Sequence, residues 1–100
     1  MRGAAKRYHL APAARADLES IWLYTAERWS PDQADRYHNL LIDGIASLLR
    51  NPYRGLAADR IRRGYRRLNS RSHAIFYRIS GDTIEVIRIL HASMDFGRHL

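Results

Sequence analysis

The sequence of 100 residues contains no cysteine, so neither a disulfide nor a thiolate metal site can stabilise the fold. This composition is usual in a reducing compartment, and we expect a cytoplasmic location. Long apolar runs are also missing. No stretch approaches the ~18 apolar residues of a membrane span, and the N-terminus lacks the apolar core of a secretion signal. We therefore expect no contact with a membrane.

Lysine and acidic residues are scarce, whereas arginine is abundant. Lys6 is the only lysine, and 17 basic side chains stand against 10 acidic ones, which gives a formal net charge of +7. A GC-rich genome would favour arginine over lysine, but it does not explain why six arginines lie between Arg60 and Arg71. Guanidinium groups suit carboxylates and phosphates. The basic second half therefore indicates an anionic partner, either a nucleic acid or an acidic protein.

The first half of the chain has a helical period. A short extended stretch at residues 6–10 is followed by Pro12, which is well placed in the first turn of a helix. Ser30, Pro31 and Gln33 then form a strong helix-start signature, because serine is a good cap and proline suits the first helical position. We expect two antiparallel helices joined by almost no linker.

The second half changes to a strand period. After an expected loop at residues 53–64, runs rich in β-branched and aromatic residues predict strands near 64–69, 72–79 and 83–90, with a tight turn at Gly81. We expect an α+β fold in one domain over residues 1–100. In it, an N-terminal strand and a two-helix antiparallel hairpin accompany a small antiparallel sheet, and the hairpin packs on that sheet.

The helices and strands carry more apolar surface than one core needs. Leu23 and Tyr24 are adjacent to further apolar residues, and at ~100° per residue such neighbours cannot all face one partner. Leu40 and Ile42 widen the apolar arc of the second helix in the same way. Both faces of the last two strands are also largely apolar, and two helices would leave one face open. We therefore expect a docking partner, either an amphipathic helix or an added strand.

The residues that could carry chemistry do not form a convincing catalytic set. None of the histidines has a metal-ligand spacing and no glycine run matches a phosphate loop, so we expect no metal and no cofactor. His73 or His91, near Arg67, Arg78 and Arg88, could serve acid–base chemistry on RNA. A strand histidine is, however, more often structural.

Two arginines and the last ten residues each leave two interpretations open. Arg78 and Arg88 interrupt the apolar alternation, which is costly unless they are paired or reach solvent. They either form salt bridges, with Glu85 or Asp95, or create a basic patch on the open face of the sheet. The C-terminal residues are either frayed or a helical turn. In that turn, the i, i+3, i+4 spacing puts Asp95, Arg98 and His99 on one side, and Met94 and Leu100 anchor the turn.

Several stretches together resemble a known family over nearly the whole chain. They are LAPAARADLESIWLYTAERW, SPDQADRY, RNPYRG, IRRGYRRLNSRSHAIFYRI and VIRILHASMDFGRHL. The last two are the most specific, and the chain resembles the ParE branch of the ParE/RelE toxin family, the toxins of bacterial type II toxin–antitoxin modules. The resemblance implies a small cytoplasmic toxin that inhibits DNA gyrase by binding, without catalysis, and blocks replication.

The resemblance also implies partners and site residues. A ParD-like antitoxin is expected to dimerise through a DNA-binding N-terminal domain and to wrap the toxin with its C-terminal segment. Operator DNA is then contacted only indirectly, through the antitoxin. The residues expected to bind the antitoxin are Leu23, Tyr24, Leu40 and Ile42. Those expected to serve toxicity and target binding are Arg67, Arg78, Arg88, Met94, Asp95, Arg98, His99 and Leu100.

A RelE-like ribosome-dependent mRNA endoribonuclease is the alternative within the same fold. Arg67 occupies roughly the place of one strand lysine of such enzymes. Ala74 stands where they carry an arginine, and the tail has Phe96 and Leu100 but no tyrosine. The pattern therefore favours the gyrase inhibitor, while His91 and His99 keep the alternative open.

Overall fold

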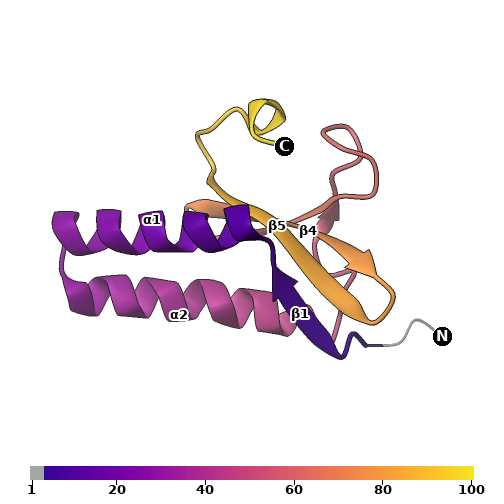
Figure 1. The fold of residues 1–100 in the computed structure, drawn as a ribbon, viewed down its shortest axis with the longest axis horizontal. Coiled ribbons are helices and arrows are strands. Elements are labelled where there is room, and N and C mark those ends of the chain that lie inside the picture. The colour runs from indigo at the N-terminus through magenta and orange to yellow at the C-terminus, as the bar shows by residue number, and fades with distance from the viewer. Residues whose placement is uncertain (1–3) are drawn as a thin grey trace.

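Two helices and a five-stranded sheet make up the part of the chain that the structure, a computed structural model, describes, namely residues 4–100 (Figure 1). Residues 1–3 of the expected domain lie outside the described residues. The elements are β1 (Arg7–Leu10), α1 (Pro12–Arg28), α2 (Pro31–Ser47), β2 (Leu56–Ala57), β3 (Arg66–Ser70), β4 (His73–Ser80), β5 (Thr83–His91) and a 3₁₀ turn η1 (Phe96–Arg98).

The helical hairpin forms where its local signals predict it. Pro12 and Pro31 lie in the first turns of α1 and α2, and the Ser30 hydroxyl accepts a hydrogen bond of 3.1 Å from the Gln33 N–H. The two helices run side by side and project beyond one end of the sheet (Figure 1). Among residues 4–100, neither helix has the length and hydrophobicity of a membrane span.

The sheet has the strand order β1-β5-β4-β3-β2 and is mixed, not wholly antiparallel as expected. The meander β3-β4-β5 is antiparallel, and Gly81 has a φ of +59° in its tight turn, as predicted. β1, however, pairs with β5 in parallel. A parallel pair needs a long connection, which the helical hairpin and the meander supply. The expected loop at 53–64 also contains the two-residue strand β2.

A β-bulge at Ile87 shifts the register of the last hairpin. Tyr77 lies opposite Val86, but Phe76 lies opposite Arg88, so Ile87 has no partner on β4. Regular alternation would put Arg88 on the same face as Val86. The bulge instead turns Arg88 to the face that carries Phe76, and it also places His73 opposite His91, where a regular register would place Leu90.

The buried residues form one cluster on each face of the sheet. On the helix side, Tyr77 is fully buried, and its hydroxyl donates to the Pro52 carbonyl at 2.6 Å. The other members there come mainly from both helices and the strands β3, β4 and β5: Ala5, Ala14, Leu18, Leu41, Ile45, Leu48, Leu68, Ile75, Ile84, Val86 and Ile89. On the opposite face the cluster consists of Ala58, Ala74, Phe76 and Leu90, with Ile61, Tyr65, Phe96 and Leu100 packed against it.

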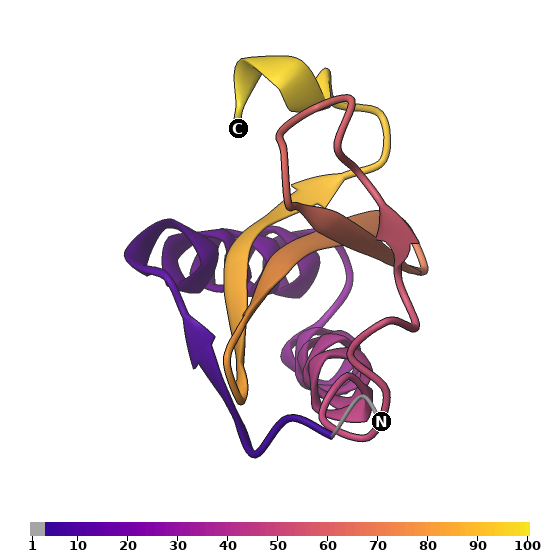
Figure 2. The same ribbon diagram turned by 90° about the vertical axis from the view of Figure 1, so that its right-hand side faces the viewer.

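The expectation of an open apolar sheet face is therefore wrong. Phe76 is fully buried because two irregular segments cover it, which we name the arginine loop (residues 58–65) and the C-terminal segment (residues 92–100). Both lie beyond the same side of the sheet in Figure 2. The excess apolar surface expected on α1 is confirmed, because the exposed fractions of Leu23 and Tyr24 are 56% and 62%.

Candidate functional site

The C-terminal segment rests on a row of side chains that crosses three strands. Arg67, Phe76 and Arg88 are directly opposite one another on β3, β4 and β5. The ring of Phe96 meets Phe76 edge to face, with 4.9 Å between centroids, and the Arg67 guanidinium lies 5.7 Å from the Phe96 centroid. Arg67 and Arg88, which are 21 positions apart in the sequence, thus flank the same aromatic contact.

Arg88 links the C-terminal segment to helix α1. Its Nε and Nη2 donate to the two carboxylate oxygens of Asp17 at 2.8 Å each, and its Nη1 donates to the His99 carbonyl at 3.1 Å. Asp17 also accepts the Ile89 N–H at 2.9 Å. The hydrogen bond with Asp17 raises the pKa of Arg88, so Arg88 keeps its positive charge. A salt bridge between Arg88 and either Glu85 or Asp95 was expected. This expectation is wrong, because the partner of Arg88 is Asp17.

The rest of the C-terminal segment is held unevenly. Leu100 packs on the second core cluster, and its carbonyl accepts a hydrogen bond of 3.1 Å from Arg62. Met94, expected as an anchor, has an exposed fraction of 38%, and Phe96 takes that place. Asp95 and Arg98 form an exposed ion pair at 3.7 Å. The turn therefore presents polar groups to solvent while Phe96 and Leu100 fix it.

Arginines from the arginine loop and from β3 lie beside the C-terminal segment: Arg62 donates to the main-chain oxygen of Leu100, and Arg67 lies against Phe96. Among residues 4–100, no Asp or Glu side chain lies within ion-pair distance of Arg60, Arg62, Arg63 or Arg67. The Nε of Arg67 is buried without a hydrogen-bond partner in the described chain. Such cations favour an anionic partner. Arg78 differs, because it forms the expected salt bridge with Glu85.

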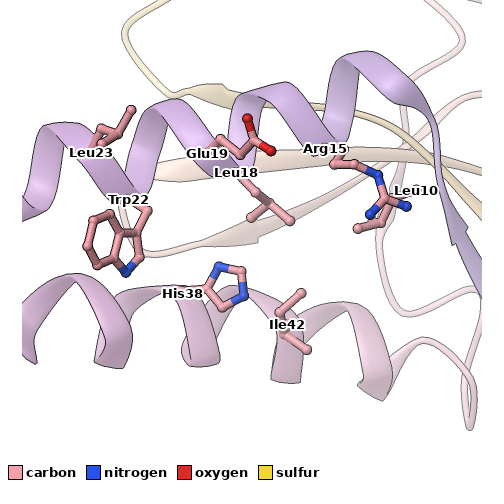
Figure 3. Close-up of a pocket in the computed structure, with 8 residues that line it drawn as sticks. All are labelled: Leu10, Arg15, Leu18, Glu19, Trp22, Leu23, His38 and Ile42. Carbon is pink, nitrogen blue, oxygen red and sulfur yellow. The ribbon is translucent and has the colours of Figure 1, made fainter. Parts of the chain in front are cut away.

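A second candidate surface is a groove between the two helices, which we name the helical groove (Figure 3). It has a volume of about 620 Å³ and is mostly apolar. Trp22 and Leu18 are directed from α1 toward His38 and Ile42 on α2, and the Trp22 indole N–H donates to Asp35 at 2.9 Å. The full lining is Leu10, Arg15, Leu18, Glu19, Trp22, Leu23, His38 and Ile42.

The four residues expected to bind an antitoxin do not share one surface. Leu23 and Ile42 line the helical groove. Tyr24 lies on the neighbouring side of α1 and lines a different pocket, while the half-buried Leu40 lies outside the lining of both. Sequence reasoning missed Trp22 as a groove residue because its indole could equally have belonged to the core.

Two histidines considered for acid–base chemistry lie together on the helix side of the sheet, whereas Arg67 and Arg88 are on the opposite face. The ring centroids of His73 and His91 are 5.2 Å apart, and His73 Nδ1 lies 2.6 Å from the Tyr37 hydroxyl. Burial lowers the pKa of His73 to about 4, an effect that His91 strengthens and Asp17 opposes. His73 is therefore neutral near pH 7. No group of three or more His, Cys, Asp or Glu side chains in residues 4–100 is arranged to hold a metal ion.

Comparison with known sequences gives a consistent result. Residues 8–96 match the family described as "ParE toxin of type II toxin-antitoxin system, parDE". A relative named "Toxin ParE1" from Mycobacterium tuberculosis (strain H37Rv) is 48% identical over 97 residues, which cover 96% of this chain and 99% of the relative. A protein of the same name from Caulobacter vibrioides is 42% identical over 95 residues, with coverage of 95% and 98%.

Two solved structures have the same fold. The chain aligns with one described as "Chromosomal ParDE TA system from P. aeruginosa" with a TM-score of 0.77 and 19% identity, over 88% of this chain and 96% of the other. It aligns with a toxin–antitoxin complex RelBE2 from Mycobacterium tuberculosis with a TM-score of 0.69 and 18% identity, over 94% and 98%. At identities this low the two alignments bear on the fold alone. They confirm the expected RelE/ParE-like α+β architecture.

The first prediction concerns the link between Asp17 and Arg88. Asp17→Asn removes the charge that compensates a partly buried guanidinium held by two hydrogen bonds, so we expect the free energy of unfolding to fall by about 2 kcal/mol. Asp95→Asn is the matched control, because its ion pair is exposed and should contribute less than about 0.5 kcal/mol. Urea unfolding of both variants measures the difference. Equal effects would contradict a structural role for the Asp17 carboxylate.

The second prediction concerns His73 and pH. Its pKa of about 4 in the folded chain lies below the ~6.5 of an unfolded histidine, so the unfolded chain binds more protons between these values. Stability should therefore fall as the pH drops from about 6.5 toward 4. His73→Gln should make this decline shallower in a series of melting temperatures. His9→Gln, which changes an exposed histidine on β1, should leave the slope unchanged; a wild-type slope in His73→Gln would refute the assignment.

Proposed function

This chain belongs to the ParE toxin family of type II toxin–antitoxin systems, and from that membership we propose that it inhibits DNA gyrase by binding and so blocks replication. The toxin acts in the cytoplasm and is neutralised by a ParD-like antitoxin. The antitoxin alone contacts operator DNA. Inhibition by binding needs no nucleophile and no cofactor in the toxin, so the relevant features are its surfaces.

The observation that carries the target proposal is the C-terminal segment held on a basic face. Phe96 and the carbonyls of His99 and Leu100 are fixed by Phe76, Arg88 and Arg62. The exposed side chains of Met94, Asp95, Arg98 and His99 are thereby offered in one conformation, beside arginines without acidic partners. A preorganised segment loses little conformational entropy on binding. In this arrangement Arg67 and Arg88 position the C-terminal segment. Arg78 would contact the target farther from this segment.

The helical groove supports the antitoxin proposal. Its apolar lining includes Leu23, and an amphipathic segment of the antitoxin would cover this surface with its apolar face. Arg15 and Glu19 at the groove offer charges of both signs, which would fix the direction of the bound segment. Leu40 and Tyr24 would contact the antitoxin only where its chain continues beyond the groove.

We expect Leu23→Asp to weaken antitoxin binding at least about tenfold, because a carboxylate would be buried against apolar side chains. Leu56→Asp is the matched control. Leu56 is about equally exposed, but it lies on β2 at the far edge of the sheet. Isothermal titration of each folded variant with the antitoxin measures the difference. Equal affinities for the two variants would rule out the groove as the docking surface.

The test of the function is the order in which two syntheses stop. The chain is expressed from a tightly controlled promoter in a bacterium without the antitoxin, and incorporation of thymidine and methionine is followed during the first minutes. We expect DNA synthesis to fall first while translation continues. Purified gyrase should then lose supercoiling activity when the chain is added.

An early collapse of translation would overturn the gyrase proposal and favour the mRNA endoribonuclease instead.

An exposed arginine gives a control within the same assay. Arg98→Gln should weaken the inhibition, whereas Arg36→Gln on α2, away from the C-terminal segment, should not.

A further inference from the structure

A pocket of about 590 Å³ lies under the projecting end of the helical hairpin, and we name it the histidine pocket. It is distinct from the helical groove and from the C-terminal segment. Its lining is Ser20, Ile21, Tyr24, Thr25, Trp29, Gln33, Tyr37, Ser72, His73, His91 and Ser93. None of these residues is Asp, Glu, Lys or Arg, although 27% of the chain is charged. A pocket of this size and polarity suits a small uncharged group with polar atoms.

The hydrogen bonds of the histidine pocket determine where its protons lie. His91 Nδ1 accepts a hydrogen bond of 3.1 Å from the Ser93 N–H, which can only donate, and also lies 2.7 Å from the Ser93 hydroxyl; Nδ1 is therefore engaged within the chain and the ring carries its proton on Nε2. The Tyr37 hydroxyl accepts from the Ser72 N–H at 3.3 Å and lies 2.6 Å from His73 Nδ1, so this nitrogen is also engaged within the chain. His73 is neutral near pH 7. The Nε2 atoms of both histidines have no hydrogen-bond partner in the described chain, so they are available to a group bound in the pocket that these residues line.

Aromatic rings and cations complete the surroundings. Tyr24 and Trp29 line the pocket with exposed fractions of 62% and 69%, so most of each side chain is open to a bound group. Arg28 lies at its edge, with its guanidinium carbon 5.8 Å from the Tyr24 centroid. Arg71 directly precedes the lining residue Ser72 and is exposed. The lining is thus uncharged. Charges of both signs lie near it, because Asp32 directly precedes the lining residue Gln33 and is also exposed.

We propose that the histidine pocket binds one unstacked nucleobase of a single-stranded nucleic acid. Trp29 and Tyr24 stack on the base, and the Nε2 atoms of His73 and His91 form hydrogen bonds with polar atoms on its edge. Arg28 and Arg71 contact the phosphates on either side. An uncharged interior with two arginines beside it fits a nucleotide strand, because its bases are uncharged and its backbone is anionic. An acidic peptide would instead need cations inside the pocket.

The test separates base binding from attraction to the phosphates. The full chain is titrated into labelled single-stranded pentathymidylate and into an abasic pentamer of the same charge, and fluorescence anisotropy gives the affinities. Pentauridylate is run beside them to compare ribose with deoxyribose strands. The variants are Trp29→Ala and His91→Phe. Leu56→Ala, which changes an exposed residue on β2 outside both pockets, is the control.

We expect the abasic strand to bind at least about fivefold more weakly than pentathymidylate or pentauridylate. Trp29→Ala and His91→Phe should remove that difference by weakening only the strand with bases, while Leu56→Ala should preserve it. Both changed side chains are exposed, so the variants should melt at the wild-type temperature. Equal affinity for the abasic strand, or equal losses on both probes, would overturn the proposal. Neither result depends on gyrase, so the target proposal is tested separately.

Discussion

The arrangement of this molecule depends on the contact between Asp17 and Arg88. β1 ends at Leu10, so beyond Val86 no strand within residues 4–100 borders the outer edge of β5. Asp17 fills this place, because its carboxylate accepts the Ile89 N–H together with two hydrogen bonds from Arg88. Arg88 in turn holds the His99 carbonyl. One ion pair thereby joins the helical hairpin, the central sheet and the C-terminal segment.

The bulge at Ile87 makes this contact possible and separates the surfaces. It turns Arg88 to the face that carries Phe76, while Ile89 returns to the core on the helix side. The proposed antitoxin groove then lies between the helices and the proposed target-binding face lies across the sheet. The same shift puts His73 opposite His91, which creates the histidine pocket. A single inserted residue thus serves three features that are far apart in the sequence.

The sequence predicts most of the elements but few of their long-range contacts. Pro12, Ser30 and Gly81 act locally, and the helices and the last hairpin begin and turn where these residues predict. The parallel pairing of β1 joins residues 76 positions apart, and Arg88 and its partner are 71 positions apart, which no local pattern reports. The covering of Phe76 was missed because irregular segments have no period. The apolar residues Phe96 and Leu100, four positions apart, were the available signal.

Hydrogen exchange of individual backbone amides tests the central role of Asp17 most directly. In Asp17→Asn, the amides of Ile89, Arg98 and His99 should exchange at least about tenfold faster, relative to amides in the middle of α2 in the same sample. That result would show that the carboxylate holds both the edge of β5 and the C-terminal segment. If Arg98 and His99 keep their wild-type protection while Ile89 exchanges faster, the C-terminal segment is held independently and the account is contradicted.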